Sequence, residues 1–255
     1  MPSTAALPEI AAIRYVAALR EGGSMPGLVE ADDDGLYVLK FRGAGQGPLA
    51  LVAEVIACEL ARALGLRVPQ LALVDVDPVL GRAEPDPEIQ ELILASGGLN
   101  VGVDFLPGAL AYTPSGAVQP RAEPAADIVW LDALLTNVDR TAANPNMLVW
   151  HEQVWLIDHG AALYLQHAGL KPAEQATRTF PQIADHVLLP RAGSILDADE
   201  RLACRIERAL LEQVVALVPD GWFVGDAAEV YVEYLERRLQ APRAFAQEAE
   251  RVRIA

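Results

Sequence analysis

The polar segment NVDRTAANPNML, residues 137–148, carries acidic and amide side chains at a spacing that could do chemistry. Asp139 and Asn144 lie five positions apart, and Asp158 follows Asn144 by 14 positions. Mg²⁺ prefers hard oxygen ligands, takes only one or two from carboxylates, and leaves the rest to water and phosphate oxygens. Asn144 and Asp158 therefore match a magnesium site, and Asp139 is left to orient an acceptor hydroxyl and take its proton. Arg140 is expected to brace the loop or to contact phosphate.

The elements that flank this segment would bring these side chains together. Residues 125–137 (AADIVWLDALLTN) have apolar residues at helical spacing and predict a helix that leads into the loop. Two apolar runs, 147–150 and 154–158, flank the residues HEQ and predict a tight hairpin. Such a hairpin would return Asp158 to the side of Asp139.

The first part of the chain is predicted to be rich in strands. Residues 35–41 (GLYVLKF) alternate as a strand does, and Lys40 is expected to point inward. Residues 47–66 show the 3.6-residue apolar pattern of a helix that ends at Gly65. Further strands are predicted at 68–77, 89–95 and 99–106, with an acidic, Pro-rich turn at 78–88.

The second part is predicted to be rich in helices. Pro, Gly and Ser are concentrated from Pro107 to Pro124, and we place the junction between the two parts at about Pro107. A long irregular stretch is expected over 161–198, followed by helices at 199–218 and 226–252.

Composition limits the class of protein. With 255 residues and 52% hydrophobic content, the chain can build one large domain or two modest lobes. No apolar run reaches the roughly 18 residues of a membrane span, and the start lacks a signal-peptide pattern. We therefore expect a soluble, cytoplasmic protein with no membrane partner. The formal charge of -15 disfavours direct binding to nucleic acid. Cys58 and Cys204 are expected to be buried free thiols, with no disulfide or zinc site.

The motifs, taken in order, resemble those of the protein-kinase-like superfamily, and more specifically the HipA-like kinases with phosphatidylinositol-kinase-like active sites. The segment DRTAAN (139–144) is similar to the DRHxxN catalytic loop, and IDHG (157–160) stands where the family has a DFG-like, metal-binding Asp. YVLKF (37–41) resembles the strand that carries the phosphate-binding lysine, and residues 49–69 resemble the helix that follows it.

This resemblance extends from about Gly22 to Ala198 and implies an α+β fold with two lobes. The strand-rich N-lobe would comprise residues 1–107, and the helical C-lobe residues 108–255. The implied activity is transfer of phosphate from ATP, with Mg²⁺, to a Ser or Thr hydroxyl on a protein. The sequence itself does not indicate an antitoxin-like partner.

The resemblance also implies the roles of individual residues in the N-lobe. Lys40 would bind the ATP phosphates and Glu54 would be its ion-pair partner. Glu54 is the only charge in LALVAEVIAC, where an unpaired carboxylate facing the core would cost several kcal/mol. Glu59 is the second choice. In the C-lobe, Asp139 would position the acceptor, and Asn144 and Asp158 would hold the metal.

Two further segments would bind the nucleotide. The turn EGGSMPG, which contains Gly23 and Ser24, would cover the phosphates, because its glycines let backbone N–H groups approach them. The segment VDFLPG would be the hinge, where the backbone of Asp104, Phe105 and Leu106 meets the adenine.

Two positions depart from the family pattern. Thr141 stands where DRHxxN has His, so the function of that ring must be absent or replaced. His159 stands where DFG has Phe, and its smaller polar ring is expected to weaken packing around Asp158. No APE-like segment is present, which argues against an ordinary eukaryotic-type protein kinase.

Other interpretations stay open at this stage. An aminoglycoside- or choline-kinase-like enzyme that phosphorylates a small molecule shares the DxxxxN spacing, but it carries a His shortly before the Asp. A non-catalytic nucleotide-binding protein would be consistent with Thr141 and His159, the two residues that depart from the family pattern. Taken singly, Lys40 and Glu54 could be solvated surface residues, and Asp139 and Asn144 could cap turns. The remaining histidines, His151, His167 and His186, are expected to be ordinary surface or loop residues.

Overall fold

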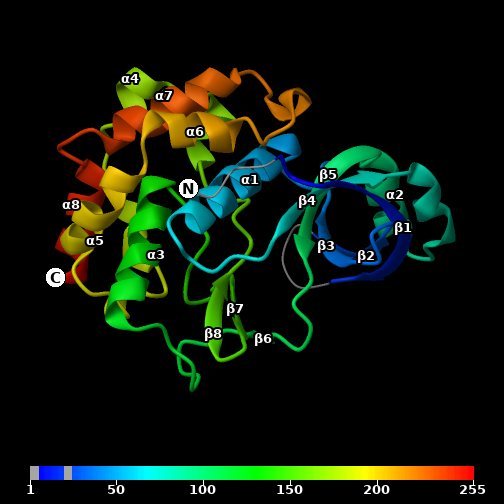
Figure 1. The fold of residues 1–255 in the computed structure, drawn as a ribbon, viewed down its shortest axis with the longest axis horizontal. Helices are drawn as coiled ribbons and strands as arrows, with labels where there is room; N and C mark the ends of the chain where they lie inside the picture. The colour runs from blue at the N-terminus through cyan, green and yellow to red at the C-terminus, as the bar shows by residue number, and fades with distance from the viewer. Residues whose placement is uncertain (1–5, 20–24) are drawn as a thin grey trace.

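The computed structural model describes residues 6–19 and 25–255, which build a barrel followed by a mainly helical part. Five strands close into the barrel in the order β1-β2-β3-β5-β4 (Figure 1). Strands β4 and β1 are parallel, and the other neighbours are antiparallel. The strands are β1 (Glu9–Ala18), β2 (Gly27–Ala31), β3 (Leu36–Lys40), β4 (Leu71–Val76) and β5 (Gly98–Asp104).

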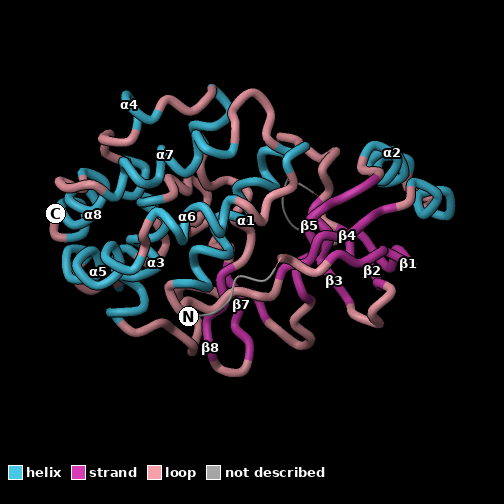
Figure 2. Tube along the Cα trace, turned by 45° about the horizontal axis from the view of Figure 1, so that its top comes forward, coloured by secondary structure: helices cyan, strands magenta, loops and turns pink. Residues whose placement is uncertain are grey.

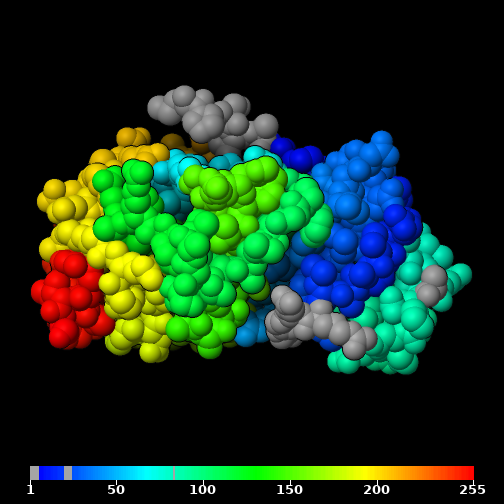
Figure 3. All heavy atoms as spheres, turned by 90° about the horizontal axis from the view of Figure 1, so that it is seen from below, coloured from blue at the N-terminus to red at the C-terminus, as the bar shows by residue number. Residues whose placement is uncertain are grey.

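The rest of the chain forms a small sheet and the helical part, which lies at the opposite end of the molecule from the barrel (Figure 2). In Figure 3 the green middle of the chain lies between the blue barrel and the yellow-to-red C-terminal helices. The sheet has the order β6-β7-β8. These elements are β6 (Leu110–Ala111), α3 (Ala122–Leu134), β7 (Met147–Trp150), β8 (Gln153–Leu156), α4 (Pro172–Gln175), α5 (Ile195–Leu202), α6 (Arg208–Val215), α7 (Ala228–Leu239) and α8 (Ala244–Arg253).

Strand β3 separates two apolar clusters, and this separation sets the direction of Lys40. Leu39 and Phe41 are buried in a cluster inside the barrel. Val38 packs against the larger cluster on the other face of the strand. Because side chains alternate along a strand, Lys40 shares the face of Val38 and not that of Leu39. Lys40 therefore points toward the main core, as the sequence predicts.

Helix α1 (Pro48–Ala63) connects the barrel to the helical part. Pro48 occupies the first turn of the helix, where backbone N–H groups have no intrahelical acceptor, so the lack of an N–H in proline costs nothing. Gly65 follows the end of the helix with a φ of 85°. The residues from Leu51 to Ala61 are all buried. The helix lies between the barrel and the helices of the second part in Figure 1, and it packs against α6. One continuous apolar core therefore runs from α1 to α8.

The strand predicted at 89–95 is wrong, because these residues belong to helix α2 (Pro87–Ala95). Asp86 caps the helix by accepting a hydrogen bond from the backbone N–H of Glu88, and Pro87 fills its first position. The buried residues are Ile89, Leu92 and Ile93, which have helical spacing and pack into the barrel cluster. The turn predicted at 78–88 contains a 3-10 helix over Pro78–Ala83.

Both predicted C-terminal helices are interrupted. The first is divided into α5 and α6, and a 3-10 turn, Ala203–Arg205, lies between them. The second is divided into α7 and α8 around Pro242, which has no N–H to continue a helix. Strand β1 was not predicted, since register shifts between Ala12 and Arg14 and between Tyr15 and Ala17 break its two-residue alternation.

The two cysteines differ in exposure. Cys58 is buried, but Cys204 is exposed, because it lies in the 3-10 turn after α5 and not inside a helix. Among the residues that the structure describes, no helix is long and apolar enough to cross a membrane.

Candidate active site

Lys40 lies between two carboxylates that come from distant parts of the chain. Its Nζ is 3.7 Å from Oε2 of Glu54 in α1, and it also forms an ion pair with Oδ1 of Asp158, which follows β8. The Lys40 side chain is 12% exposed and that of Glu54 3%. Burial opposes the charge on Lys40, but the two carboxylates raise its pKa above the ordinary value. Lys40 is therefore a charged side chain at the meeting point of the barrel, α1 and the segment after β8.

Glu54 has a second partner besides Lys40. Its Oε2 accepts a hydrogen bond of 2.7 Å from the backbone N–H of His159. Burial raises the pKa of Glu54, and the charge of Lys40 partly offsets this effect. The second-choice residue, Glu59, instead pairs with Arg62, three residues later on α1.

The hairpin predicted before Asp158 is present and is tighter than the sequence suggests. Trp150 pairs with Gln153, so only His151 and Glu152 form the turn, with φ values of 48° and 59°. Positive φ at both positions is the geometry of a two-residue hairpin turn that matches the twist of the strands. The hairpin returns the chain to the polar loop, and Asp158 follows with a φ of 55°.

The loop 137–148 holds Asp139 through two amide side chains. Oδ2 of Asp139 accepts hydrogen bonds from Nδ2 of Asn144 at 2.8 Å and from Nδ2 of Asn146 at 3.0 Å. The loop is closed by the backbone N–H of Thr141, which donates to the carbonyl oxygens of Asp139 and Asn144. Thr141 Oγ1 in turn accepts from the backbone N–H of Asn144 at 3.2 Å. Thr141 therefore stabilises the turn.

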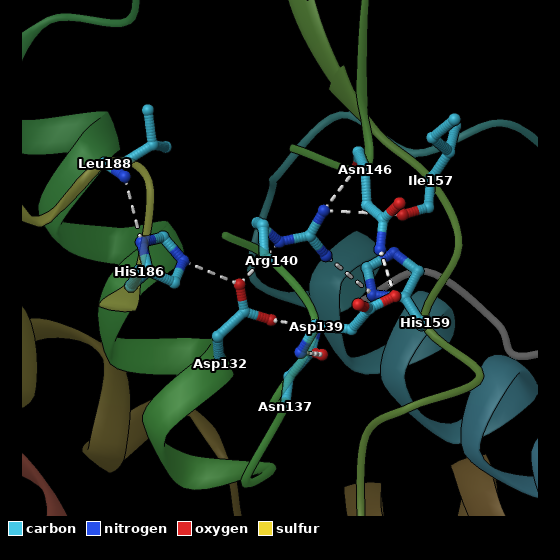
Figure 4. Close-up of polar contacts among 9 residues, drawn as sticks. All are labelled: Asp132, Asn137, Asp139, Arg140, Asn146, Ile157, His159, His186 and Leu188. Carbon is cyan, nitrogen blue, oxygen red and sulfur yellow. Dashed lines mark hydrogen bonds and ion pairs between the residues drawn. The ribbon is translucent and has the colours of Figure 1, made fainter. Parts of the chain in front are cut away.

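Arg140 is fully buried and joins the polar loop to the segment after β8 (Figure 4). Its Nε donates to Oδ2 of Asp132 at 2.6 Å, and its Nη1 donates to the carbonyl oxygen of Asn146. Its Nη2 lies 3.2 Å from Nδ1 of His159. Of the two functions expected for Arg140, bracing matches this geometry, whereas a buried guanidinium cannot reach phosphate.

Asp132 and His186 complete the buried network under the loop. Asp132, in α3, accepts from Nδ2 of Asn137 at 2.9 Å as well as from Arg140. Nδ1 of His186 accepts from the backbone N–H of Leu188, so Nε2 carries the proton and donates to Asp132 at 3.0 Å. Burial opposes the charge on Asp132, but Arg140 and His186 hold the pKa of this carboxyl well below its usual range.

His186 corrects an expectation, because it is buried at 4% exposure and is not a surface residue. Its backbone forms an isolated β-bridge with Thr141, the position at which the loop lacks the histidine of the family pattern. An imidazole from another segment therefore braces the loop. Burial lowers the pKa of His186, which keeps the ring neutral.

His159 is likewise buried, and a polar contact holds its ring beside Asp158. The side chain is 1% exposed, and its Nδ1 is the acceptor for Arg140. Burial and the charge of Arg140 lower its pKa to about 3. The ring is therefore neutral, with Nε2 carrying the proton, and this nitrogen has no partner among the described residues.

The three hinge residues predicted to meet the adenine differ in whether their backbone N–H groups have partners. The N–H groups of Asp104 and Phe105 donate to the carbonyl oxygens of Gln70 and Leu36 at 2.9 and 3.0 Å. Within the described part of the chain, the N–H of Leu106 has no partner. The predicted phosphate-covering residues Gly23 and Ser24 lie outside the described residues.

A cavity of about 270 Å³ adjoins the hinge and is distinct from the ion pairs described above. Leu106 and Asp104 contribute to its wall, together with Trp150 and Trp155 of the hairpin. Lys40 is not among its lining residues, so this cavity is not the place where phosphate would meet the lysine.

The residues predicted to bind metal carry the oxygen donors that a hard divalent cation takes. Across residues 6–19 and 25–255, no three His, Cys, Asp or Glu side chains are grouped so as to hold a metal. Mg²⁺ does not need such a cage, because one or two protein oxygens suffice when water and phosphate complete the octahedron. The Asp158 side chain is 37% exposed and already pairs with one cation, the ammonium group of Lys40. Asn144 is exposed on the loop.

Sequence reasoning missed three residues of this network. Asp132 carried a usable signal, because it is a charge within the apolar stretch IVWLDALL, as Glu54 is in α1. Asn146 received no function from the sequence, although its amide contacts Asp139. His186 had no signal, because it lies 54 residues from Asp132 in an irregular segment.

Comparisons with known proteins bear on the family and the fold. A family model described as "HipA-like kinase" matches residues 12–243. The crystal structure of a Helicobacter pylori proinflammatory kinase, CtkA, superposes with a TM-score of 0.54 and 16% identity, over 97% of this chain and 99% of that one. The Golgi casein kinase, crystallised with Mn/ADP bound, gives a TM-score of 0.52 and 13% identity, over 97% and 73% of the two chains. A search of curated proteins finds no match.

At these identities the solved structures show the fold, which is kinase-like: a β-barrel followed by a mainly helical part. The predicted α+β class is therefore confirmed. The family model covers most of the sequence, including the lysine strand, the polar loop and the segment after the hairpin. The chain belongs to the HipA-like kinase family.

Proposed function

We propose that this chain transfers the γ-phosphoryl group of ATP, in the presence of Mg²⁺, to a Ser or Thr hydroxyl on a protein. The observation that carries the proposal is the position of Lys40, which is paired with Glu54 and Asp158 beside the loop that holds Asp139. Phosphoryl transfer asks a protein mainly for placement and charge neutralisation, and a charged lysine held at this junction supplies both. We also propose that the lobes meet at about Pro107.

Lys40 would contact the phosphates, with Glu54 holding it in place. Asn144 and Asp158 would hold the metal, which would neutralise charge on the phosphate oxygens. The Golgi casein kinase structure contains Mn/ADP, and this supports a nucleotide and a divalent cation for the shared fold. Leu106 would donate its free N–H to the adenine, while Asp104 and Phe105 shape the hinge. Gly23 and Ser24 would cover the phosphates.

Asp139 would act on the acceptor. The acceptor oxygen forms a new bond to the γ-phosphorus, and the bond from that phosphorus to the β–γ bridging oxygen breaks. ADP leaves with the electron pair of the broken bond, and the proton of the acceptor hydroxyl passes to the carboxylate of Asp139. The phosphorylated acceptor, ADP and the proton together account for all atoms and charges.

The test is incubation with γ-labelled ATP, Mg²⁺ and a cell lysate. We compare the wild type with Asp139→Asn, Asp158→Asn and the exposed control Asp75→Asn, each of which replaces a carboxylate by an amide. Label on protein, reduced about 10²- to 10⁴-fold by Asp139→Asn but unchanged by Asp75→Asn, supports the proposal. Label only on a small metabolite would make the chain a small-molecule kinase. Nucleotide binding with no transfer would make it a non-catalytic protein, and neither binding nor transfer would refute the proposal.

A further inference from the structure

Asn146 contacts the same carboxylate oxygen of Asp139 as Asn144 does, although neither the motif nor the proposed mechanism gives it a function. Its Nδ2 donates to Oδ2 of Asp139 at 3.0 Å (Figure 4). We propose that Asn146 is a positioning residue that fixes the carboxylate of Asp139 with Oδ1 directed to the acceptor. This inference rests on the proposed function.

The backbone of Asn146 is held firmly enough for this purpose. The residue is 8% exposed, and its carbonyl oxygen accepts hydrogen bonds from Nη1 of Arg140 and, at 3.0 Å, from the backbone N–H of Ile157. Its φ is 48°, in the left-handed region, which asparagine tolerates better than most residues. Contacts from both the loop and the segment before Asp158 therefore determine where its amide lies.

Asn144 is not an equivalent support. It is exposed, and its side-chain oxygen is the one proposed to bind metal. Its orientation is therefore expected to depend on whether metal and nucleotide are present. In the proposed mechanism Asn146 contacts neither the metal nor the nucleotide. Its hydrogen bond to Asp139 would therefore persist through the reaction cycle.

The two amides also distinguish the oxygens of Asp139. Both donate to Oδ2, and no side chain or backbone group of the described residues donates to Oδ1. Oδ1 is thus the oxygen available to the acceptor hydroxyl. Asn146 therefore orients the carboxylate of Asp139 through one oxygen and leaves the other oxygen free for the acceptor.

The test compares Asn146→Gly with Ala143→Gly. Glycine at 146 removes the amide but keeps a residue that adopts positive φ freely. Ala143 is an exposed residue of the same loop whose methyl side chain cannot form a hydrogen bond, so its replacement controls for loop flexibility. We expect Asn146→Gly to lower kcat about 10- to 100-fold with little change in the KM for ATP. We expect Ala143→Gly to stay close to wild type in both kcat and KM.

A second measurement does not depend on activity. In ¹³C NMR spectra recorded at one pH, the carboxyl resonance of Asp139 should shift in Asn146→Gly, which removes one hydrogen-bond donor to Oδ2, and stay in place in Ala143→Gly. Unchanged kcat and an unchanged resonance in Asn146→Gly would overturn the inference even if the wild type is an active kinase. If the wild type shows no transfer, the proposed function fails, and with it the catalytic part of the inference. The NMR resonance still decides whether Asn146 holds the Asp139 carboxylate.

Discussion

The backbone N–H of His159 donates a hydrogen bond to the carboxylate of Glu54, which lies 105 residues earlier in the chain. The same carboxylate pairs with Lys40. Helix α1 therefore fixes two components of the candidate site at once: the lysine from the barrel and the backbone next to Asp158. In this fold Glu54 connects the two parts of the molecule, in addition to neutralising a lysine.

Replacing Glu54 tests this double function. Glu54→Ala leaves a buried ammonium group and a buried N–H without this acceptor, and we expect it to lower the free energy of unfolding by about 3–5 kcal/mol. Glu54→Gln keeps an oxygen that can accept from His159, so its cost should be smaller, about 1–3 kcal/mol. Urea unfolding measures both values. Equal losses for the two variants would show that the hydrogen bond to His159 contributes nothing.

The pair of Arg140 and Asp132 should behave as one unit. Both side chains are buried, at 0% and 1% exposure, and Nε lies 2.6 Å from Oδ2. Arg140→Met leaves the buried carboxylate without its cation and should cost about 3–5 kcal/mol. Adding Asp132→Asn removes that uncompensated charge, so the double variant should be more stable than the sum of the single losses predicts. A double-mutant cycle from unfolding measurements should give a coupling of about 2–3 kcal/mol, and additivity within about 0.5 kcal/mol would contradict it.

His159 makes stability depend on pH with a definite sign. Its native pKa is about 3, against an ordinary value of 6.5, so between these two the unfolded state binds one more proton than the native state. Stability is therefore lost as the pH falls below the ordinary value, at about 1.4 kcal/mol per pH unit for each such proton. The lowered pKa of His186 acts in the same direction.

The variant His159→Asn isolates this contribution. Asparagine keeps an oxygen near the position of Nδ1 to accept from Arg140, but it does not titrate. We expect the slope of the unfolding free energy against pH, measured in urea between about pH 6 and pH 5, to be smaller than in the wild type. The difference should correspond to about one proton, which is about 1.4 kcal/mol per pH unit. At about pH 7.5 and above, the two slopes should coincide. An unchanged slope at acid pH would show that His159 is not held neutral in the folded protein.

The sequence alone could predict the position of a residue where the residue types next to it in the chain decide its environment. Glu54 could be selected because a single carboxylate in an apolar helix needs a partner. The same rule, applied to Asp132 in α3, would have identified the acceptor for Arg140. Asp86 followed by Pro87 is a helix start, and this cap predicts the helix that the apolar pattern of 89–95 alone does not.

Other features could not be predicted because they depend on contacts between distant segments. His186 reaches Asp132 only after the irregular stretch has folded under the loop, and irregular backbone has no periodicity to indicate direction. Asn146 is of a residue type that is common in turns, and only its position in the folded chain shows that its amide reaches Asp139. The packing of α1 against α6 likewise follows from the tertiary arrangement and not from the pattern within either helix.

The two cysteines offer a simple chemical test of the fold. Cys58 is buried in α1, and this burial raises the pKa of its thiol well above the ordinary value, whereas Cys204 is exposed. Because the thiolate is the reactive form, only Cys204 should react rapidly with a thiol reagent such as DTNB in the folded protein. We expect one equivalent to react quickly and the second only after unfolding in guanidinium. In Cys204→Ser the rapid phase should disappear, while Cys58→Ser should retain it. Two rapid equivalents in the native wild type would mean that α1 is not packed between the barrel and the helical part.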